Sequence, residues 1–303
     1  MIDLRRLHVL RAVAHYGTVT AAAQSLHLTP SAASQQVRQL GRELGVTLLE
    51  PQGRRVRLTS AARALLTHAH AIEERWRQAE TELRACDGSP TGVLRMASFP
   101  TAIAAVLAPT AARLHAEHPG LTVEMHEGEV SDCVDLLFDG GAELAVLEAV
   151  ADGPATTDPR FEQHPLLDDP FDLMVAADHP LAGRTSVELV ELATERWIVP
   201  TPPCASRQHV LAACSAAGFT PAAAHHIGDI RAAAALVEQG LGIAMVPRIA
   251  GLQTNRHVAR LPITGPAIPA RKLVTAVRRG TGTSPAVSTA LRALHDQADR
   301  LRR

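Results

Sequence analysis

The chain has 303 residues, of which 46% are hydrophobic and 20% charged, and its formal net charge is −1. This composition excludes general disorder and is typical of a folded protein with more than one domain. Uncharged apolar runs stay shorter than the roughly 18 residues of a membrane span, and the charged N-terminal segment lacks the apolar core of a signal peptide. Four scattered cysteines make no disulfide framework, so we expect a cytoplasmic protein.

The small net charge hides an uneven distribution of charge along the chain. Residues 1–60 contain eight arginines and three acidic residues, a balance of +5, whereas residues 89–303 have a balance of −5. A basic segment joined to an acidic body is typical of a nucleic-acid-binding module. A membrane-surface helix needs lysines and large apolar groups on one face, which this segment lacks, so we expect no membrane partner.

Three short helices are predicted within the first 45 residues. Asp3 caps the first helix, which stops at Gly17, a residue suited to the position just past a helix end. Thr18 caps the second, an alanine-rich segment that another helix can approach closely. Thr29 caps the third, with Pro30 at its first position, where a missing N–H costs nothing. The second and third helices, joined by a tight turn, predict a helix-turn-helix.

The third helix has two faces of opposite chemistry. An apolar stripe recurs at helical spacing through Ala33, Val37, Leu40 and Leu44. Hydroxyls, an amide and guanidinium groups occupy the opposite side: Ser31, Ser34, Gln35, Arg38 and Arg42. Such a face suits the major groove of DNA, where a helix presents donors and acceptors to base edges. Taken alone, the helix also fits a simple solvated surface.

Residues 47–59, "TLLEPQGRRVRLT", predict a β-hairpin wing. A β-like run is followed by a Pro-Gln-Gly turn and then by arginine alternating with valine or leucine. Arginines on such a wing reach phosphates or a narrow minor groove. We therefore predict a DNA-binding surface made of Thr29, Ser31, Ser34, Gln35, Arg38, Arg54, Arg55 and Arg57.

Residues 59–87 predict a linker helix of about 27 residues that begins at Thr59. Apolar residues in this segment alternate in steps of four and three, which is the heptad pattern of a coiled coil. An isolated helix of this kind leaves large apolar side chains exposed, so a partner helix is implied. We predict dimerisation through Leu65, Ile72, Trp76 and Leu83; packing against the same chain is the alternative.

From Val93 onward, strand patterns alternate with helix patterns, which predicts an α/β fold with a mainly parallel sheet covered by helices. Strands are expected at 93–98, 121–127, 143–149, 171–177, 196–200, 242–247 and 272–280. Helices are expected at 101–117, 131–139, 205–217, 229–239 and near the C-terminus. Two such sets predict two α/β lobes joined by crossing strands.

The stretch "GTVTAAAQSLHLTPSAASQQVRQLGRELGVTLLEPQGRRVRLTSAA" resembles the winged helix-turn-helix of the LysR-type transcriptional regulators along its whole length. The resemblance implies an N-terminal winged helix-turn-helix at 1–58, a linker dimerisation helix at 59–87, and a two-lobed, periplasmic-binding-protein-like effector domain at 92–303. Lobe I would comprise about 92–162 and 266–303, and lobe II about 163–265. The implied partners are double-stranded DNA, a small-molecule effector, further copies in a homodimer or homotetramer, and RNA polymerase as a candidate.

A two-lobed fold of this kind binds its ligand between the lobes, beyond the carboxyl ends of strands. The expected effector-binding residues follow predicted strands or begin predicted helices: Ser98, Thr101, Glu129, Ser131, Thr201, Pro202 and Ser206. Helix N-termini offer free N–H groups, so we expect a carboxylate-bearing effector. For each hydroxyl, a helix-capping role without any ligand is the alternative.

The sequence carries no nucleophile elbow, P-loop, H-E-x-x-H or paired C-x-x-C motif, so we expect no enzyme, metal site or cofactor. One alternative is a thiol-based redox-sensing regulator using Cys204 and Cys214, which an intact helix would hold about 15 Å apart. Another is a small-molecule-binding protein without DNA function. Salt-dependent DNA binding distinguishes a regulator from that second alternative.

Overall fold

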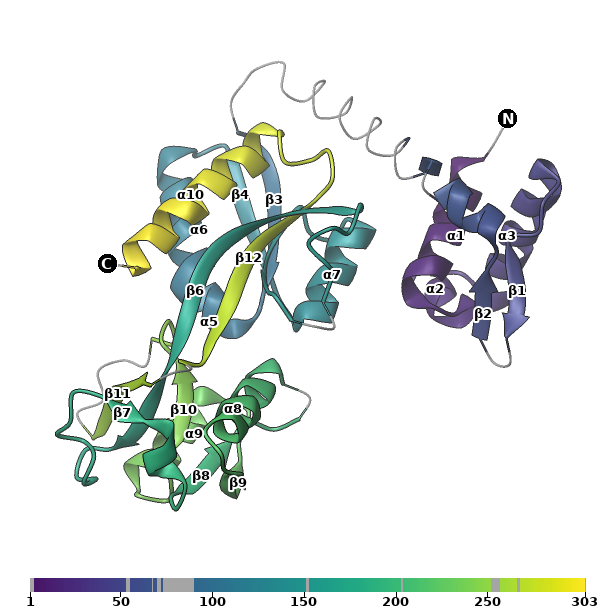
Figure 1. The fold of residues 1–303 in the computed structure, drawn as a ribbon. Helices are drawn as coiled ribbons and strands as arrows, with labels where there is room; N and C mark the ends of the chain where they lie inside the picture. Colours follow the sequence, from purple (N-terminus) through teal and green to yellow (C-terminus); the bar gives the residue numbers. More distant parts are fainter. Residues whose placement is uncertain are drawn as a thin grey trace. The chain divides into compact units, whose positions relative to one another are not determined.

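The computed structural model describes residues 3–52, 55–66, 68–69, 72, 90–150, 153–202, 204–251, 257–265 and 268–302. The chain divides into two compact units, Met1–Cys86 and Asp87–Arg303 (Figure 1). None of the helices in the described ranges is long and apolar enough to span a bilayer.

The N-terminal unit begins with three helices, α1 (Leu4–Tyr16), α2 (Val19–Ser25) and α3 (Pro30–Leu44). The three predicted N-caps are confirmed, because each side chain accepts a backbone N–H bond from the first turn of its helix: Asp3 from Arg5, Thr18 from Ala21, and Thr29 from Ala32. Gly17 ends α1 with φ 71° and Gly45 ends α3 with φ 69°, conformations that favour glycine.

Two short strands follow, β1 (Leu49–Gln52) and β2 (Arg55–Leu58), and they form the predicted antiparallel hairpin with Glu50 opposite Arg57. Residues 60–66 are helical, and Thr59 caps them by accepting from the N–H of Ala62 at 3.1 Å. The core of this unit gathers residues from all three helices: Leu10, Val13, Ala22, Ala23, Ala33, Val37 and Leu40. Packing of this small core orients the polar face of α3 outward.

In the C-terminal unit, lobe I is built on three parallel strands in the order β4 (Leu121–Glu127), β3 (Gly92–Ser98) and β5 (Leu144–Glu148). The helices α6 (Ala108–Glu117) and α10 (Pro285–Leu301) cover one face, and α7 (Val130–Asp139) covers the other (Figure 1). The two faces have separate cores, one around Met96, Leu114 and Leu294 and one around Leu137 and Phe138.

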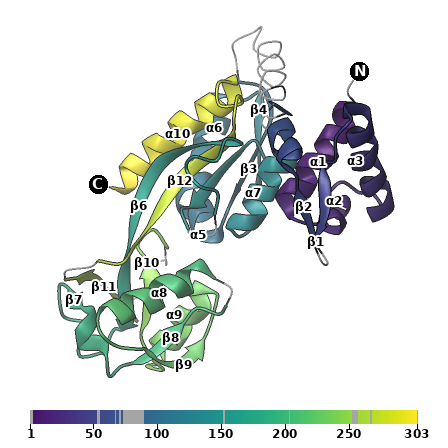
Figure 2. The same ribbon diagram turned by 45° about the vertical axis from the view of Figure 1, so that its right-hand side comes forward.

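Two long strands, β6 (Phe161–Ala176) and β12 (Ala270–Arg278), run antiparallel to each other and join the lobes (Figure 2). β6 contributes Leu167 to the lobe I core and Phe171 to the lobe II core. The eight-stranded sheet is therefore mixed, which corrects the expectation of a mainly parallel sheet.

Lobe II adds β10 (Ala244–Pro247) and β11 (Val258–Thr264) antiparallel to β6, with the two-residue β7 (Val187–Glu188) beside β11. A separate parallel pair consists of β8 (Arg196–Val199) and β9 (Ala222–His226). The helices are α8 (Ala205–Ala216) and α9 (Ile230–Glu238), which match the predicted ranges closely. Trp197 is fully buried at the centre of the lobe II core.

The predicted helix over 101–117 is present as α5 (Pro100–Ala102), a π-helical turn η2 (Ile103–Leu107) and α6. Pro109 in α6 has no N–H for the carbonyl of Ala105, and a wider turn separates the proline ring from that carbonyl. Gln297 of α10 donates to the Ala105 oxygen at 3.1 Å, so the carbonyl is satisfied by a side chain.

Candidate DNA-binding surface and effector cleft

The outer face of α3 is exposed as the sequence predicts. Ser31, Gln35 and Arg38 are exposed and Ser34 is half-buried, while Ala33, Val37 and Leu40 are buried on the opposite side. The Thr29 hydroxyl accepts from the Ala32 N–H and lies 3.1 Å from the Ser31 hydroxyl. Thr29 therefore acts first as a helix cap that fixes where α3 begins.

A hollow of about 870 Å³ separates α3 from the wing and exposes groups of both elements, among them Ser34, Arg38, Arg42, Glu50 and Val56. On the wing, Arg57 donates to Glu50 across the hairpin at 2.5 Å, and both side chains are exposed. Exposed pairs of this kind are weak, so Arg57 can exchange Glu50 for a phosphate. Arg54 and the side chain of Arg55 lie outside the described part of the wing.

The start of the predicted linker helix packs on its own unit. Leu66 and Ala69 are buried in the N-terminal core and Leu65 is half-buried against it. Ile72 is 50% exposed. Trp76 and Leu83, the other two predicted dimerisation residues, lie outside the described residues.

A cavity of about 390 Å³ lies between the two lobes of the C-terminal unit, a size typical of small-molecule sites. Of the predicted effector residues, Thr101 and Glu129 line it from lobe I and Ser206 lines it from lobe II. Much of the remaining wall is apolar, including Phe99, Val130, Ile198, Ile227 and Met245.

Four predicted effector residues do not line this cavity. Ser98 is fully buried and donates its hydroxyl to the Val146 carbonyl at 2.7 Å, so its assignment as an effector contact is corrected: it ties β3 to β5. Ser131, Thr201 and Pro202 are exposed on the loops or helix starts where the sequence puts them, but outside the cavity wall.

The floor of the cavity contains an ionic network that the sequence analysis missed. Arg271 of β12 is 3% exposed, and its Nε donates to Asp169 of β6 at 2.8 Å. Its Nη2 donates to the Thr101 hydroxyl at 2.8 Å, and its Nη1 lies 3.9 Å from Glu148 at the end of β5. The guanidinium also lies over the Phe99 ring. Burial raises the pKa of Asp169, although Arg271 and the N–H of Ile249 act in the opposite direction.

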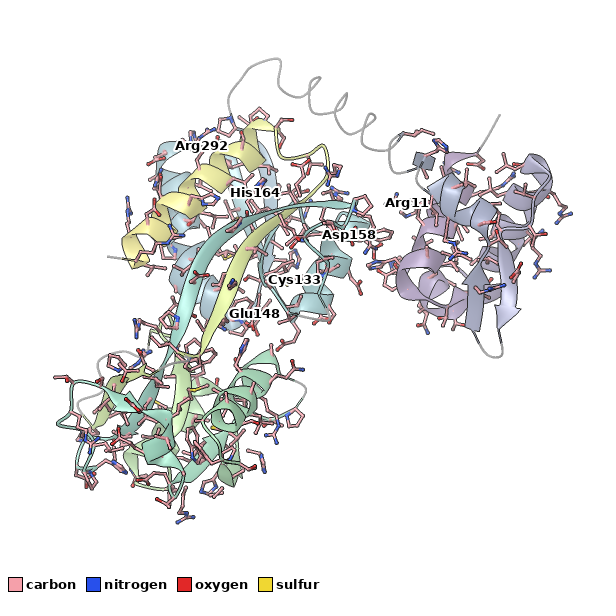
Figure 3. The ribbon with its side chains drawn as sticks, in the orientation of Figure 1. Arg11, Cys133, Glu148, Asp158, His164 and Arg292 are labelled. Carbon is pink, nitrogen blue, oxygen red and sulfur yellow. The ribbon has the colours of Figure 1, made fainter. Side chains whose placement is uncertain are left out.

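The network extends across the cleft. His209 of α8, in lobe II, contacts the carboxylate of Glu148, in lobe I, through its Nε2. Glu148 is 4% exposed, and Figure 3 marks it near the lobe II end of the lobe I sheet. The His209 ring also packs 5.4 Å from that of Phe171 on β6. In the sequence, Glu148 is a charged residue at the end of the apolar strand "LAVLE", and this position was the signal that could have indicated it.

Helix N-termini from both lobes point at the cavity, and they differ in how they are capped. Asp132 accepts from the Glu129 N–H at the start of α7, and Asp229 accepts from the Ala232 N–H at the start of α9. The caps of α5 and α8 are Phe99 and Cys204, and neither makes a side-chain capping bond. At α5, Pro100 has no N–H and the Ala102 N–H donates to the Phe99 carbonyl at 3.1 Å, so of these two sites the start of α8 is the one that suits an anionic group.

The two cysteines considered for redox sensing lie at opposite ends of α8. Cys204 is half-buried at the helix start and lines the cavity, whereas Cys214 is fully buried in the lobe II core. Burial raises the pKa of the Cys214 thiol to about 11. The intact helix between them separates the two sulfurs by far more than a disulfide allows.

Comparison with known families agrees with this architecture. Residues 4–63 match the family described as "Bacterial regulatory helix-turn-helix protein, lysR family", and residues 87–299 match "LysR substrate binding domain". The chain belongs to the LysR family of bacterial transcriptional regulators. It is thus a DNA-binding regulator with an effector-binding domain.

Among its relatives, the RuBisCO operon transcriptional regulator of Allochromatium vinosum is 31% identical over 94% of this chain and 93% of its own length. The dual regulator OxyR of Escherichia coli is 27% identical over 82% of this chain and 80% of its own. Both of these relatives are named as regulators of transcription.

Solved structures show the same fold. CbnR bound to its target DNA matches with a TM-score of 0.59 and 24% identity, covering 98% of this chain and 99% of that one. An OxyR variant from Pseudomonas aeruginosa matches with a TM-score of 0.65 and 21% identity, covering 98% and 95%.

Proposed function

We propose that this LysR-type regulator acts as a dimer or tetramer whose DNA geometry changes when a small carboxylate-bearing effector binds between its lobes. The observation that supports this most is a cavity of about 390 Å³, walled by both lobes, on the chain that carries the winged helix-turn-helix. A ligand that contacts both lobes binds one lobe arrangement better than another and so shifts the population of geometries.

In this proposal residues 1–58 bind DNA, residues 59–87 dimerise, and residues 92–303 bind the effector. Ser31, Ser34, Gln35 and Arg38 contact bases and nearby phosphates, Thr29 fixes the start of α3, and Arg54, Arg55 and Arg57 contact phosphates from the wing. The solved complex of CbnR with its target DNA supports this arrangement by fold similarity. Because its proposed partner is DNA, we also propose that the protein is cytoplasmic.

For the effector, Thr101, Glu129 and Ser206 are the proposed side-chain contacts, with Arg271 and Glu148 as the floor. The uncapped start of α8 supplies N–H groups for a carboxylate. Ser131, Thr201 and Pro202 are proposed to contact the effector when the two lobes are closer together.

For assembly, the exposed side chain of Ile72 and the heptad pattern through Leu65, Trp76 and Leu83 support pairing of two linker helices. Two winged modules on one dimer then bind two half-sites. RNA polymerase is a candidate partner of the DNA-bound assembly.

Gel retardation of the regulator's own upstream region tests the proposal, together with sedimentation to measure the oligomeric state. Specific binding that weakens steeply with salt is expected, since phosphate contacts release counterions. Absence of any retarded band at low ionic strength contradicts it, as does a monomer at micromolar concentration.

The thiol-sensing alternative draws support from relatives named hydrogen peroxide-inducible genes activators. In this chain Cys214 is buried with a raised pKa, so a Cys204–Cys214 disulfide requires α8 to unfold. The hypothesis of a small-molecule effector does not require α8 to unfold.

A further inference from the structure

The charge of Arg271 is already balanced within the protein. Its guanidinium is paired with Asp169 at 2.8 Å and faces Glu148 at 3.9 Å, and all three side chains are less than 5% exposed. Two carboxylates for one guanidinium leave no excess positive charge on the cavity floor. Arg271 is therefore unsuited to being the main counter-charge of an anionic ligand.

Three other charged side chains on the cavity wall, Glu129, Asp229 and Arg231, make no ion pair with any residue the structure describes. Glu129 lies in lobe I at the start of α7, and Arg231 lies in lobe II in the first turn of α9. Both are exposed to the cleft solvent. Glu129 and Arg231 carry opposite charges and belong to opposite lobes. The Asp229 carboxylate, also in lobe II, accepts the N–H of Ala232 as the N-cap of α9, and the Glu129 carboxylate takes part in the capping box of α7.

The helix starts at the cavity add to this difference in charge between the two lobes. The start of α8, with Cys204 as an uncapped N-cap and Ser206 in the first turn, presents free N–H groups in the lobe that carries Arg231. The start of α7 already has Asp132 on its N-terminal N–H and adds the Glu129 carboxylate. The start of α8 together with Arg231 thus offers a site for an anion in lobe II, where Asp229 is bound to the start of α9, and Glu129 offers a site for a cation in lobe I.

The pKa of Glu129 agrees with an electronegative lobe I wall. Burial raises this pKa above its usual value, and the nearby carboxylates of Asp132 and Glu148 raise it further. A cation placed beside Glu129 relieves that repulsion, whereas a purely anionic ligand increases it.

We propose that the effector is a small amino-carboxylate, a zwitterion whose ammonium group binds Glu129 and whose carboxylate binds Arg231 and the start of α8. Its body is apolar, because Phe99, Val130, Ile198, Ile227 and Met245 line the same cavity as the two charged residues. This inference rests on the proposed effector function and narrows the ligand from any carboxylate to one that also carries a positive charge.

The test is titration of the full-length protein, by calorimetry and thermal shift, with valine, leucine, methionine and phenylalanine. Each amino acid is compared with the acid that lacks its amino group and the amine that lacks its carboxylate. For leucine these are 4-methylpentanoate and 3-methylbutylamine. At least one amino acid is expected to bind about tenfold more tightly than either of its partners, since each partner loses one charge-assisted contact.

Two variants test which side chain binds each charged group of the ligand. Glu129→Gln is expected to reduce the gap between the amino acid and its deaminated acid, and Arg231→Gln the gap between the amino acid and its amine. Matched controls are Glu127→Gln, an exposed carboxylate two residues earlier on β4, and Arg300→Gln on α10, neither of which lines the cavity. Both controls are expected to bind as the parent does.

The outcomes separate the two proposals. If the deaminated acids bind as tightly as the amino acids, the carboxylate effector stands and the zwitterion is wrong. If the amines bind as tightly as the amino acids and the deaminated acids do not, the ligand is a cation and the zwitterion proposal is wrong. If no probe binds while specific DNA binding is intact, both effector proposals fail and the regulator assignment survives.

Discussion

At the scale of single residues, the buried guanidinium of Arg271 joins groups that lie far apart in the sequence. It contacts Asp169 on β6, Thr101 at the start of the α5 helix and the Glu148 carboxylate at the end of β5. A buried ion pair costs desolvation, so it is weak evidence for stability, but removal of one partner leaves an uncompensated buried charge. The network therefore makes the cleft floor sensitive to single substitutions.

Asp169→Asn is expected to lower the free energy of unfolding of the C-terminal unit by about 3–5 kcal/mol, because Arg271 then lacks its closest counter-charge. Urea unfolding followed by circular dichroism measures the change. The matched control is Asp168→Asn, an exposed neighbour on the same strand. Equal stability of the two variants would show that the pair contributes nothing.

Cys133 on α7 gives a prediction for alkaline pH. It is 1% exposed, and burial, Asp132 and Glu129 raise the pKa of its thiol to about 12. Since the unfolded thiol loses its proton near pH 9 and the folded one retains it, this thiol stabilises the fold fully below pH 9 and progressively less from pH 9 to about 12.

Replacing Cys133 by alanine removes that pH dependence. The variant is expected to start about 1 kcal/mol less stable at pH 8, through lost packing, and to lose stability more slowly than the parent above pH 9. Denaturant unfolding at pH 8, 9 and 10 gives both slopes. Parallel curves for the two proteins would contradict the prediction.

At the scale of elements, the helix caps of the N-terminal unit were predictable because their signals are local. Asp3, Thr18 and Thr29 each bond an N–H within three residues, and Gly17 and Gly45 have the positive φ that a helix end requires. β6 was only partly predictable. Pro165, Pro170 and two aspartates interrupt the strand pattern, and only pairing with β12 shows that the strand continues.

In the effector cleft, too, some residues were predictable from the sequence and others were not. Thr101, Glu129 and Ser206, which line the cavity, were predicted as effector contacts from the rule that ligands bind beyond strand ends. Ser98 was assigned by the same rule, but its hydroxyl points into the sheet and bonds the Val146 carbonyl. Arg271 could not be found, because its partner Asp169 lies on another strand about a hundred residues away and no local pattern joins them.

The π turn in the α5–α6 helix gives an element-scale prediction. Gln297→Ala leaves the Ala105 carbonyl without its side-chain donor and is expected to cost about 1 kcal/mol. Gln208→Ala, an exposed glutamine of α8, serves as the control for the loss of an amide. Chemical denaturation compares the two, and a loss in the control as large as in Gln297→Ala would show that the carbonyl does not depend on α10.

At the scale of the whole molecule, His209 is the side chain that ties lobe II to the buried network of lobe I. His209→Gln is expected to lower the melting temperature of the C-terminal unit by about 2–4 °C, since the flexible glutamine loses the ring packing against Phe171 and holds the Glu148 contact less rigidly. His164→Gln, an exposed histidine of β6, is the matched control (Figure 3). An unchanged melting temperature in His209→Gln would show that the lobes hold together without this contact.

The charge asymmetry of the chain leads to a test of how DNA is bound. With a balance of +5 in the first 60 residues, binding is expected to weaken with salt, and each phosphate contact adds about one unit to the slope of log affinity against log salt. Arg38→Gln is expected to reduce that slope by about one if Arg38 binds a phosphate, on specific and non-specific DNA alike. Ser34→Ala combined with Gln35→Ala is expected to keep the slope and lose specificity, since the proposed function has these side chains contact bases.

Fluorescence anisotropy on the upstream region and on a scrambled duplex, at several salt concentrations, measures both quantities. Arg292→Gln on α10 is the control, because it removes an exposed arginine from the other unit at the same net charge as Arg38→Gln. If the control lowers the slope as much as Arg38→Gln, overall charge and not the α3 face governs binding. If the Ser34 and Gln35 substitutions weaken both duplexes equally, the outer face of α3 does not distinguish base sequences.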